Sequence, residues 1–284
     1  ISQAGELTGL TDVGGGRVVV IKPYALGSYD WLSQPATQAG LAPGSSTQFT
    51  GGADARIGLG SSMVANLTVN TDFADADVDV NQFNLSPYKL FYPEKRAFFL
   101  ENTGIFSFPL NGASNDNLFF SRNIGIDSYT GQEVPINAGA KITGALGDYQ
   151  VGMLAVGTRE EGTNPSASYG VARVKRAFGG GSYIGAIAVG KRSGDYEDRY
   201  NSYNQVEGVD MRWVVIPELR IRGFLTQSRT PGFSSGQSAW GGLVYYESNH
   251  AELLWDHRYY GANFNPEVGF LEISGCVCDF ASVA

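Results

Sequence analysis

Apolar and polar residues alternate with a period of two along most of the chain. In the segment 63–70, Ala65 and Leu67 share one face, while Asn66 and Thr68 share the other. This period is typical of β-strands whose two faces meet different surroundings. The segments with this pattern are 53–59, 63–70, 136–143, 149–155, 169–178, 183–191, 209–213, 219–226, 239–246 and 250–260. They predict an all-β chain.

The connections between these segments alternate between short and long. The tight turns at 61–62 and 179–181 are followed, after the next strand, by the long polar stretches 71–135 and 193–202. Up-and-down membrane barrels keep such an order, with short turns in the periplasm and long loops outside, whereas sandwiches mix loop lengths. A tilted membrane strand also needs roughly ten residues, as these strands have. We therefore expect an antiparallel, up-and-down, transmembrane-type β-barrel with about 10–12 strands in this chain.

Aromatic residues lie near the ends of the predicted strands. Their rings form girdles at the two interfaces of a membrane barrel, because amphipathic rings favour the lipid–water boundary. The alternative is that they cap the core of a soluble barrel. The residues are Tyr149, Tyr169, Phe178, Tyr183, Trp213, Trp240, Tyr245, Trp255, Tyr259 and Tyr260.

The segment 71–135 interrupts the hairpin rhythm. A loop of this length in one domain is usually functional or folded inward, so we expect a plug or an extracellular loop. Its Glu94-Lys95-Arg96 run stands among aromatic residues, which indicates charges held by packing. Lys95 or Arg96 is expected to pair with Glu94, Glu101 or an aspartate of the lumen, in a network that includes Arg122 and anchors the plug; a ligand-binding or catalytic role is the alternative.

Composition and charge exclude several classes of protein. The chain has a formal net charge of −8 and no broad basic patch, which argues against nucleic acid as a partner. The chain has no run of 18 or more apolar residues, so its sequence predicts no transmembrane helix. Residues 1–10 do not read as a signal peptide, so we expect a mature or truncated chain. The two cysteines stand close together near the end of the chain and indicate little about the redox compartment.

Two motifs resemble catalytic signatures. Residues 232–236 match G-x-S-x-G, but a nucleophile elbow needs a strand before it and a helix after it, and a strand is predicted after this one. Ser86 and Lys89 match S-x-x-K, for which 141–144 offers a faint K-T-G partner. An esterase-like hydrolase using Ser86 and Lys89 therefore stays open as an alternative.

No metal or cofactor site is expected, with one alternative. Asp75, Asp77 and Asp79 share one face of an extended segment and offer oxygen ligands for calcium, although the EF-hand glycine and closing glutamate are missing. A solvated acidic strip is the other interpretation. His250 and His257 are seven residues apart on one predicted strand, so they point to opposite faces and do not chelate one metal.

Four ordered motifs give the chain a family resemblance. They are N-T-D-F at 70–73, F-Y-P-E-K-R-A-F-F-L-E at 91–101, F-S-R-N-I-G at 120–125 and F-N-P-E-V-G-F-L at 264–271. With them the chain resembles the outer-membrane β-barrel domain of unknown function that follows a family-9-type carbohydrate-binding-like domain in Bacteroidota and related bacteria. Members of that family carry this module upstream and continue beyond the fourth motif. We therefore expect a truncated chain, with one barrel domain at 1–271 and a tail at 272–284 that matches nothing in the family and lacks barrel alternation.

The upstream module of the family implies an association with glycans. A glycosidase needs two carboxyl groups ~5–10 Å apart, and the candidates are Asp72, Asp75, Glu94 and Glu101. Two functions follow as expectations. The first is a non-catalytic barrel in the bacterial outer membrane that contacts lipid or detergent and serves glycan-associated transport or surface binding. The second is a glycan- or ester-cleaving hydrolase with its site in 71–135.

Overall fold

The computed structural model describes residues 18–32, 44–71, 90–110, 115–126, 134–160, 165–194, 202–272 and 275–283. Twelve strands form one sheet in sequence order. They are β1 (Val19–Leu32), β2 (Gly44–Leu59), β3 (Met63–Val69), β4 (Ile136–Leu146), β5 (Tyr149–Thr158), β6 (Ala167–Gly179), β7 (Ser182–Ser193), β8 (Tyr203–Ile216), β9 (Leu219–Arg229), β10 (Ser238–Glu247), β11 (Glu252–Tyr260) and β12 (Val277–Val283).

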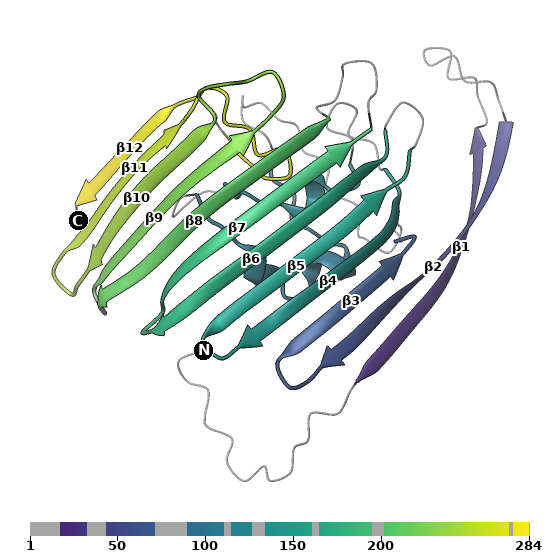
Figure 1. Ribbon diagram of the computed structural model, residues 1–284, viewed down its shortest axis with the longest axis horizontal. Coiled ribbons are helices and arrows are strands. Elements are labelled where there is room, and N and C mark those ends of the chain that lie inside the picture. Colours follow the sequence, from purple (N-terminus) through teal and green to yellow (C-terminus); the bar gives the residue numbers. More distant parts are fainter. Residues whose placement is uncertain are drawn as a thin grey trace, which may run out of the picture.

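The sheet is antiparallel throughout and strongly curved (Figure 1). Each strand pairs with its neighbours in the chain, so the predicted all-β, up-and-down arrangement is confirmed. No pairing between β1 and β12 occurs in the described part of the chain, and the sheet is open between these two edges. Among the described residues, no helix is long and apolar enough to cross a bilayer.

Three parts of the sheet differ from the sequence prediction. The strand β1 and the first half of β2 carry no clear alternation, yet they pair in register from Val19 to Leu32. Pro23 lies in β1, where a strand with one paired edge tolerates a residue without an N–H donor. The tail 272–284 was expected to lack barrel alternation, but its residues 277–283 form β12 and pair with β11.

One turn is also shorter than expected. The alternation placed the end of this strand at 143 and the start of the next at 149, but β4 continues to Leu146 and Gly144 pairs with Met63. Gly147 has a φ of 59° and supplies the left-handed backbone of a two-residue turn. The residues before it therefore remain free to stay in the ladder.

The two faces of the sheet differ in which side chains they expose. On β4, Ile142 points to the convex side and is 38% exposed, while Lys141 and Thr143 point to the concave side and are 2% and 1% exposed. Leu225 and Met153, on the convex face of β9 and β5, are 56% and 62% exposed. In a soluble protein the apolar stripe is the buried one. Here an apolar stripe is exposed on the convex face, and the buried concave face carries polar side chains together with apolar ones.

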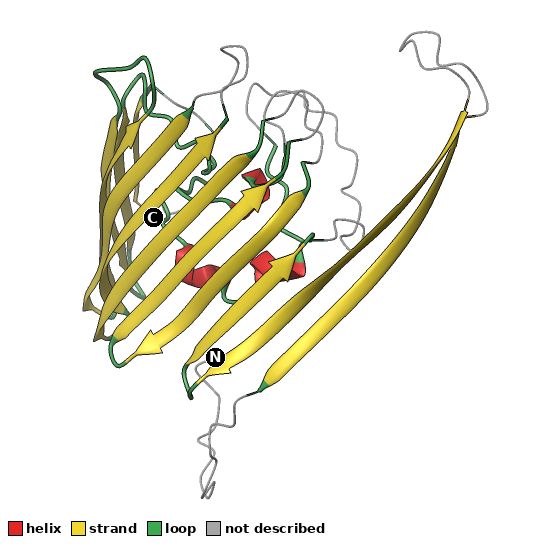
Figure 2. Ribbon diagram, turned by 45° about the vertical axis from the view of Figure 1, so that its right-hand side comes forward, coloured by secondary structure: helices red, strands yellow, loops and turns green. Residues whose placement is uncertain are grey.

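The concave face is covered by the described part of the long insertion, together with 264–271. The segment 90–126 contains α1 (Ala97–Leu100) and the 3-10 turns η1 (Thr103–Phe106) and η2 (Ser121–Asn123), all seen inside the curve of the sheet (Figure 2). We call the described residues 90–110 and 115–126 the plug. Its buried side chains form one core with inward-facing residues of the strands. The core comprises Phe98, Phe99, Phe106, Phe108, Leu110, Leu118, Phe119 and Ile124 of the plug, Ile136, Leu154, Val156, Val171, Ile187, Val189, Val206, Ala239 and Tyr260 of the sheet, and Phe264 and Val268.

Inward-facing glycines let the plug approach the sheet closely. A Cβ on Gly139 would lie 3.0 Å from Cζ of Phe98, and a Cβ on Gly208 would lie 2.8 Å from Cζ of Phe108. Real Cβ atoms are essentially never found under 3.0 Å from another heavy atom. The aromatic rings of the plug therefore occupy the space that side chains at these two positions would need.

Candidate functional site

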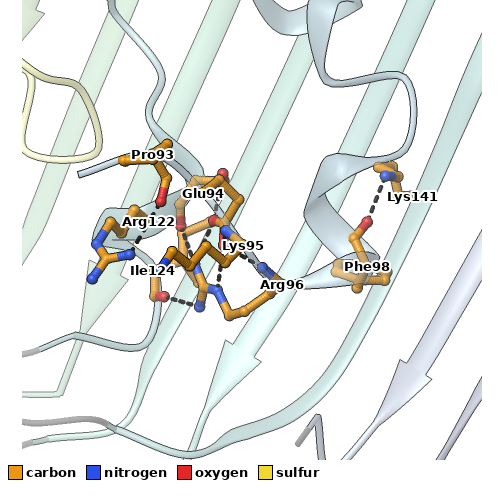
Figure 3. Close-up of polar contacts among 9 residues, drawn as sticks. Pro93, Glu94, Lys95, Arg96, Phe98, Arg122, Ile124 and Lys141 are labelled. Carbon is orange, nitrogen blue, oxygen red and sulfur yellow. Dashed lines mark hydrogen bonds and ion pairs between the residues drawn. The ribbon is translucent and has the colours of Figure 1, made fainter. Parts of the chain in front are cut away.

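The centre of the plug is the ion pair between Glu94 and Arg96 (Figure 3). Arg96 donates from Nε to Oε1 of Glu94 over 2.8 Å and from Nη2 to Oε2 over 2.7 Å. Oε1 also accepts the backbone N–H groups of Lys95 and Arg96, each over 3.0 Å. The Ser121 hydroxyl donates to Oε2 over 2.7 Å. Glu94 thus holds together the turn that starts the 91–101 motif.

The guanidinium of Arg96 joins this turn to the 120–125 motif. It donates to the carbonyl oxygens of Ile124, over 2.6 Å, and Ser121, over 2.7 Å. It also lies over the Phe99 ring, 4.3 Å from the centroid. Arg122, on the same motif, donates to the Pro93 carbonyl over 3.2 Å. The first two motifs of the plug are therefore fastened to each other.

Because the Glu94–Arg96 ion pair is buried, each of its charges needs the other for compensation. The side chains of Arg96 and Glu94 are 5% and 8% exposed. Burial alone raises the pKa of Glu94, but the hydrogen bonds and charge of Arg96 and the Ser121 hydroxyl outweigh it and leave the pKa lowered. Glu94 is therefore a carboxylate at neutral pH, and loss of either partner leaves an uncompensated buried charge.

A second contact fixes the end of α1 on β4. Lys141 donates from Nζ to the carbonyl oxygens of Phe98, over 2.5 Å, and Glu101, over 2.6 Å. These carbonyls stand at the end of α1, where backbone acceptors lack partners within the helix. Next to it, Asn102 donates to the Thr143 hydroxyl over 3.0 Å.

The side chain of Glu101 ties the plug to β2 and β3. It accepts from Nε of Arg56 over 2.7 Å and from Nδ2 of Asn66 over 2.5 Å. Burial raises the pKa of Glu101, but the hydrogen bonds with Arg56 and Asn66 outweigh it and lower the pKa. Both glutamates of the 91–101 motif are thus held in the charged form by donors.

Two further ion pairs anchor the plug and 264–271 to the inner face of the sheet. Arg173 of β6 forms a two-pronged pair with Asp210 of β8 over 2.6 and 2.8 Å and donates to the Ser107 carbonyl over 3.1 Å. Lys191 of β7 binds Glu267 over 2.9 Å. Sequence reasoning assigned no role to these four charged side chains. The alternation gave a signal only for Arg173 and Asp210, which stand on the faces opposite the exposed residues Val174 and Val209, and it did not show that they pair.

The motif at 264–271 contacts both of the motifs of the plug. Asn123 donates from Nδ2 to the Gly269 carbonyl over 2.6 Å. The Phe91 ring lies 5.0 Å from that of Phe120 and 5.3 Å from that of Phe270, with the pairs tilted or edge-to-face, as aromatic pairs prefer. The motifs at 91–101, 120–125 and 264–271 are far apart in the chain but form one joint on the concave face.

The predicted catalytic residues divide into two groups. Glu94 and Glu101 are described, and both carboxylates are occupied by cations and amides of the plug and sheet. A glycosidase acid needs a raised pKa so that it carries a proton to donate, and both of these pKa values are lowered. Their geometry therefore gives them a structural role. The other candidates lie outside the described residues: Asp72, Asp75, Ser86, Lys89, and the calcium candidates Asp77 and Asp79.

The remaining sequence motifs do not form catalytic arrangements in the described part of the chain. The G-x-S-x-G match at 232–236 lies in the loop between β9 and β10, where a strand follows in place of the helix that an elbow needs. Lys141 and Thr143 of the K-T-G match bind the plug. His250 lies in the turn before β11, not on the same strand as His257, which pairs with Asp279 over 2.5 Å. No three metal-ligating side chains are grouped among the described residues.

Comparison with known proteins gives one family. Residues 21–151 match the model of a family described as a domain of unknown function, DUF5916. The match covers β1 to the start of β5, with the plug and three of the four motifs. No curated protein matches the chain. The chain is thus similar to a family of unknown function over a region that contains two of the three motifs of the joint, 91–101 and 120–125, and the function has to be argued from the geometry.

Proposed function

We propose that the protein is a plugged β-barrel of the bacterial outer membrane, serving glycan-associated binding or transport and no catalysis. One observation carries the membrane assignment. Exposed apolar side chains cover the convex face on strand after strand, while the buried charged and polar side chains of the strands face inward, among apolar ones, toward the plug. Exposed apolar patches larger than a few hundred Å² are rare on soluble monomers, whereas lipid requires such a band.

The convex band runs across the sheet. Its exposed members are Val19, Ile21, Leu59, Leu67, Val69, Ile142, Met153, Val174, Phe178, Ile184, Val209, Met211, Trp213, Leu225, Trp240, Leu253, Trp255, Val277 and Val283. A β-sheet in a membrane also needs hydrogen-bonded edge strands, because each unpaired backbone N–H or C=O group costs roughly several kcal/mol in lipid. Pairing of the β1 and β12 edges in the membrane is therefore part of the proposal.

The plug favours ligand binding or gated transport as the function, and disfavours a permanently open pore. Apolar contacts join it to the strands on the inner side, and Lys141 and Arg173 donate hydrogen bonds to its carbonyl groups, so the described part of the plug fills part of the lumen. Glycan association rests on the resemblance to barrels that follow a carbohydrate-binding-like domain. A glycan or glycan fragment is accordingly the partner that we propose for the protein on its aqueous side.

The membrane assignment is tested by partitioning. We expect the purified chain to require detergent, to enter vesicles, and to become protected from protease on its strands. Leu225→Arg is expected to lower the stability in vesicles by about 2–4 kcal/mol, because a cation on the lipid face of a barrel costs this much near the midplane. Gln227→Arg, two residues along the same face and nearer the long loops, is the matched control and is expected to cost less.

A chain that stays monomeric and fully soluble without detergent, with Leu225→Arg folding as well as the parent, would contradict the membrane proposal. Absence of catalysis is tested on a panel of glycosides and esters. Turnover by the parent that is lost in Ser86→Ala or in Glu94→Gln, with folding intact, would favour the hydrolase instead. Binding of soluble glycans, read by calorimetry in detergent, tests the partner separately.

A further inference from the structure

The inner face of the sheet continues below the plug, toward the short-turn end of the strands. Strand register defines two cross-strand rows there. The row next to the plug is Lys175, Gly185, Asp210, Phe224, Gly241 and Arg258. The row beyond it is Tyr183, Arg212, Arg222, Leu243 and Asp256. Arg212 of β8 and Arg222 of β9 stand directly opposite each other.

Most charges in this region are already paired. Asp210 is held by Arg173 at 2.6 Å, and Asp256 by Arg258 at 3.1 Å. One step further toward the turns, Arg220 lies 3.6 Å from Glu247. Lys175 donates to the Gly104 carbonyl of the plug over 3.1 Å. The carboxylates near the two opposed arginines are therefore neutralised by other cations.

Arg212 and Arg222 have no ion pair with any described residue. Nε of Arg212 is buried and lacks a hydrogen-bond partner in the described part of the chain. Like charges directly opposite each other on one face of a sheet are destabilising. A pair of half-buried guanidinium groups at such a place is costly for the fold, and an anion between them would remove that cost.

A cavity lies beside this pair. It is a shallow pocket that is partly open to solvent, and Arg222, Tyr183, Phe224, Leu243 and the plug residues Pro109 and Leu110 are among its lining, whereas Arg212 is not. The paired carboxylates Asp210 and Asp256 also reach it. The pocket thus has one cationic side chain, Arg222, next to apolar and aromatic walls, and the body of a ligand whose acidic group lies between the two arginines would extend along these walls from the open side.

We infer that Arg212 and Arg222 form a binding site for a small organic anion, an acidic sugar or another carboxylate- or phosphate-bearing molecule. Guanidinium groups recognise both oxyanions through paired N–H donors, and rings of arginine select anions in pores. The ligand's ring would lie against Phe224 and Leu243. This inference rests on the proposed function, because it names the class of ligand that the lumen of the proposed barrel would bind.

Calorimetry on the detergent-purified full chain tests this site. Galacturonate and galactose form a matched pair that differs in the carboxylate, and inorganic phosphate probes the second oxyanion. We expect galacturonate and phosphate to bind and galactose to bind at least about tenfold more weakly. Arg222→Gln and Arg212→Gln are each expected to weaken galacturonate binding about tenfold or more. Arg229→Gln removes the same charge from the outer face of β9 and is expected to change nothing.

The folded state of each variant is checked by its thermal midpoint without ligand, which is expected to rise slightly in Arg212→Gln because the opposed charges are relieved. Equal binding of galacturonate by Arg222→Gln and Arg229→Gln would overturn the inference, as would equal binding of galacturonate and galactose. The readout does not depend on a membrane. If the chain is soluble and binds these anions in plain buffer without detergent, the anion site is supported and the membrane proposal is refuted. If the chain inserts into membranes but binds no anion, the membrane proposal is supported and the anion site is refuted.

Discussion

The outer and inner faces of β6 differ in what they require of their side chains. On the outer face, Val174 and Phe178 are 40% and 59% exposed. On the inner face, Arg173 is 2% exposed and binds both Asp210 and a carbonyl of the plug. The outer positions require only apolarity, so one apolar residue serves as well as another. The inner positions require particular partners at particular distances.

The comparison predicts that stability depends much more on inner than on outer charges. Arg96→Ala leaves Glu94 buried and unpaired, and we expect a loss of about 3–5 kcal/mol in the free energy of unfolding. Arg229→Ala removes an exposed pair with Glu207 and is expected to cost about 0–1 kcal/mol. Urea unfolding in micelles, followed by tryptophan fluorescence, measures both.

A double variant sharpens this prediction. Glu94→Gln with Arg96→Met removes both charges, so it is expected to be less costly than Arg96→Ala alone. If Arg96→Ala and Arg229→Ala lose the same stability, the ion pair of the plug does not act as a buried pair and the contrast between the faces fails.

Glycines give the next largest effect. Gly208→Val places a side chain 2.8 Å from Cζ of Phe108 and 2.9 Å from Cδ1 of Leu118, so we expect a loss of about 1–3 kcal/mol and a loosened plug. Gly170→Val on β6 is the matched variant, because nothing lies within 4 Å of the added Cβ. Protease sensitivity of the plug reports the loosening. Equal behaviour of the two variants would mean that the plug does not rest on β8.

Acid gives the smallest and most gradual effect. The pKa of Glu94 is lowered from 4.5, so its contribution is fully present above pH 4.5 and is lost as the pH falls through the lowered value. The unfolded chain takes up the proton first, which is why stability falls on acidification below 4.5. In Glu94→Gln we expect a shallower fall over this range in pH-dependent unfolding. An unchanged slope would indicate that Arg96 does not hold Glu94 in its charged form.

The strands from β3 to β11 follow from alternation alone, because each has one face in each environment. The two ends of the sheet do not. The first half of β2 is a run of small and polar residues, and its pairing with β1 depends on a neighbour at a distance in the sequence. The sequence of β12 gives little alternation to read, and only its partner β11 makes it a strand.

The candidate site was foreseen in part. The 91–101 motif indicated charges held by packing, and the pairing of Arg96 with Glu94 fits that expectation. Arg173, Asp210, Lys191 and Glu267 went unassigned because two residues that pair across the lumen are separated by tens of positions. Nothing in a single sequence aligns such residues before the strand register is known.

The sequence by itself determined the class of the molecule: an antiparallel up-and-down sheet with an apolar and a polar stripe, because side-chain direction in a strand depends only on whether a position is odd or even. The tertiary structure alone decided which charges meet. Register brought Arg173 to Asp210, and the folding of the plug onto the concave face brought Arg96 to the carbonyl groups of Ser121 and Ile124. The same register set Arg212 against Arg222, because contacts across a sheet depend on the alignment of whole strands and not on local pattern.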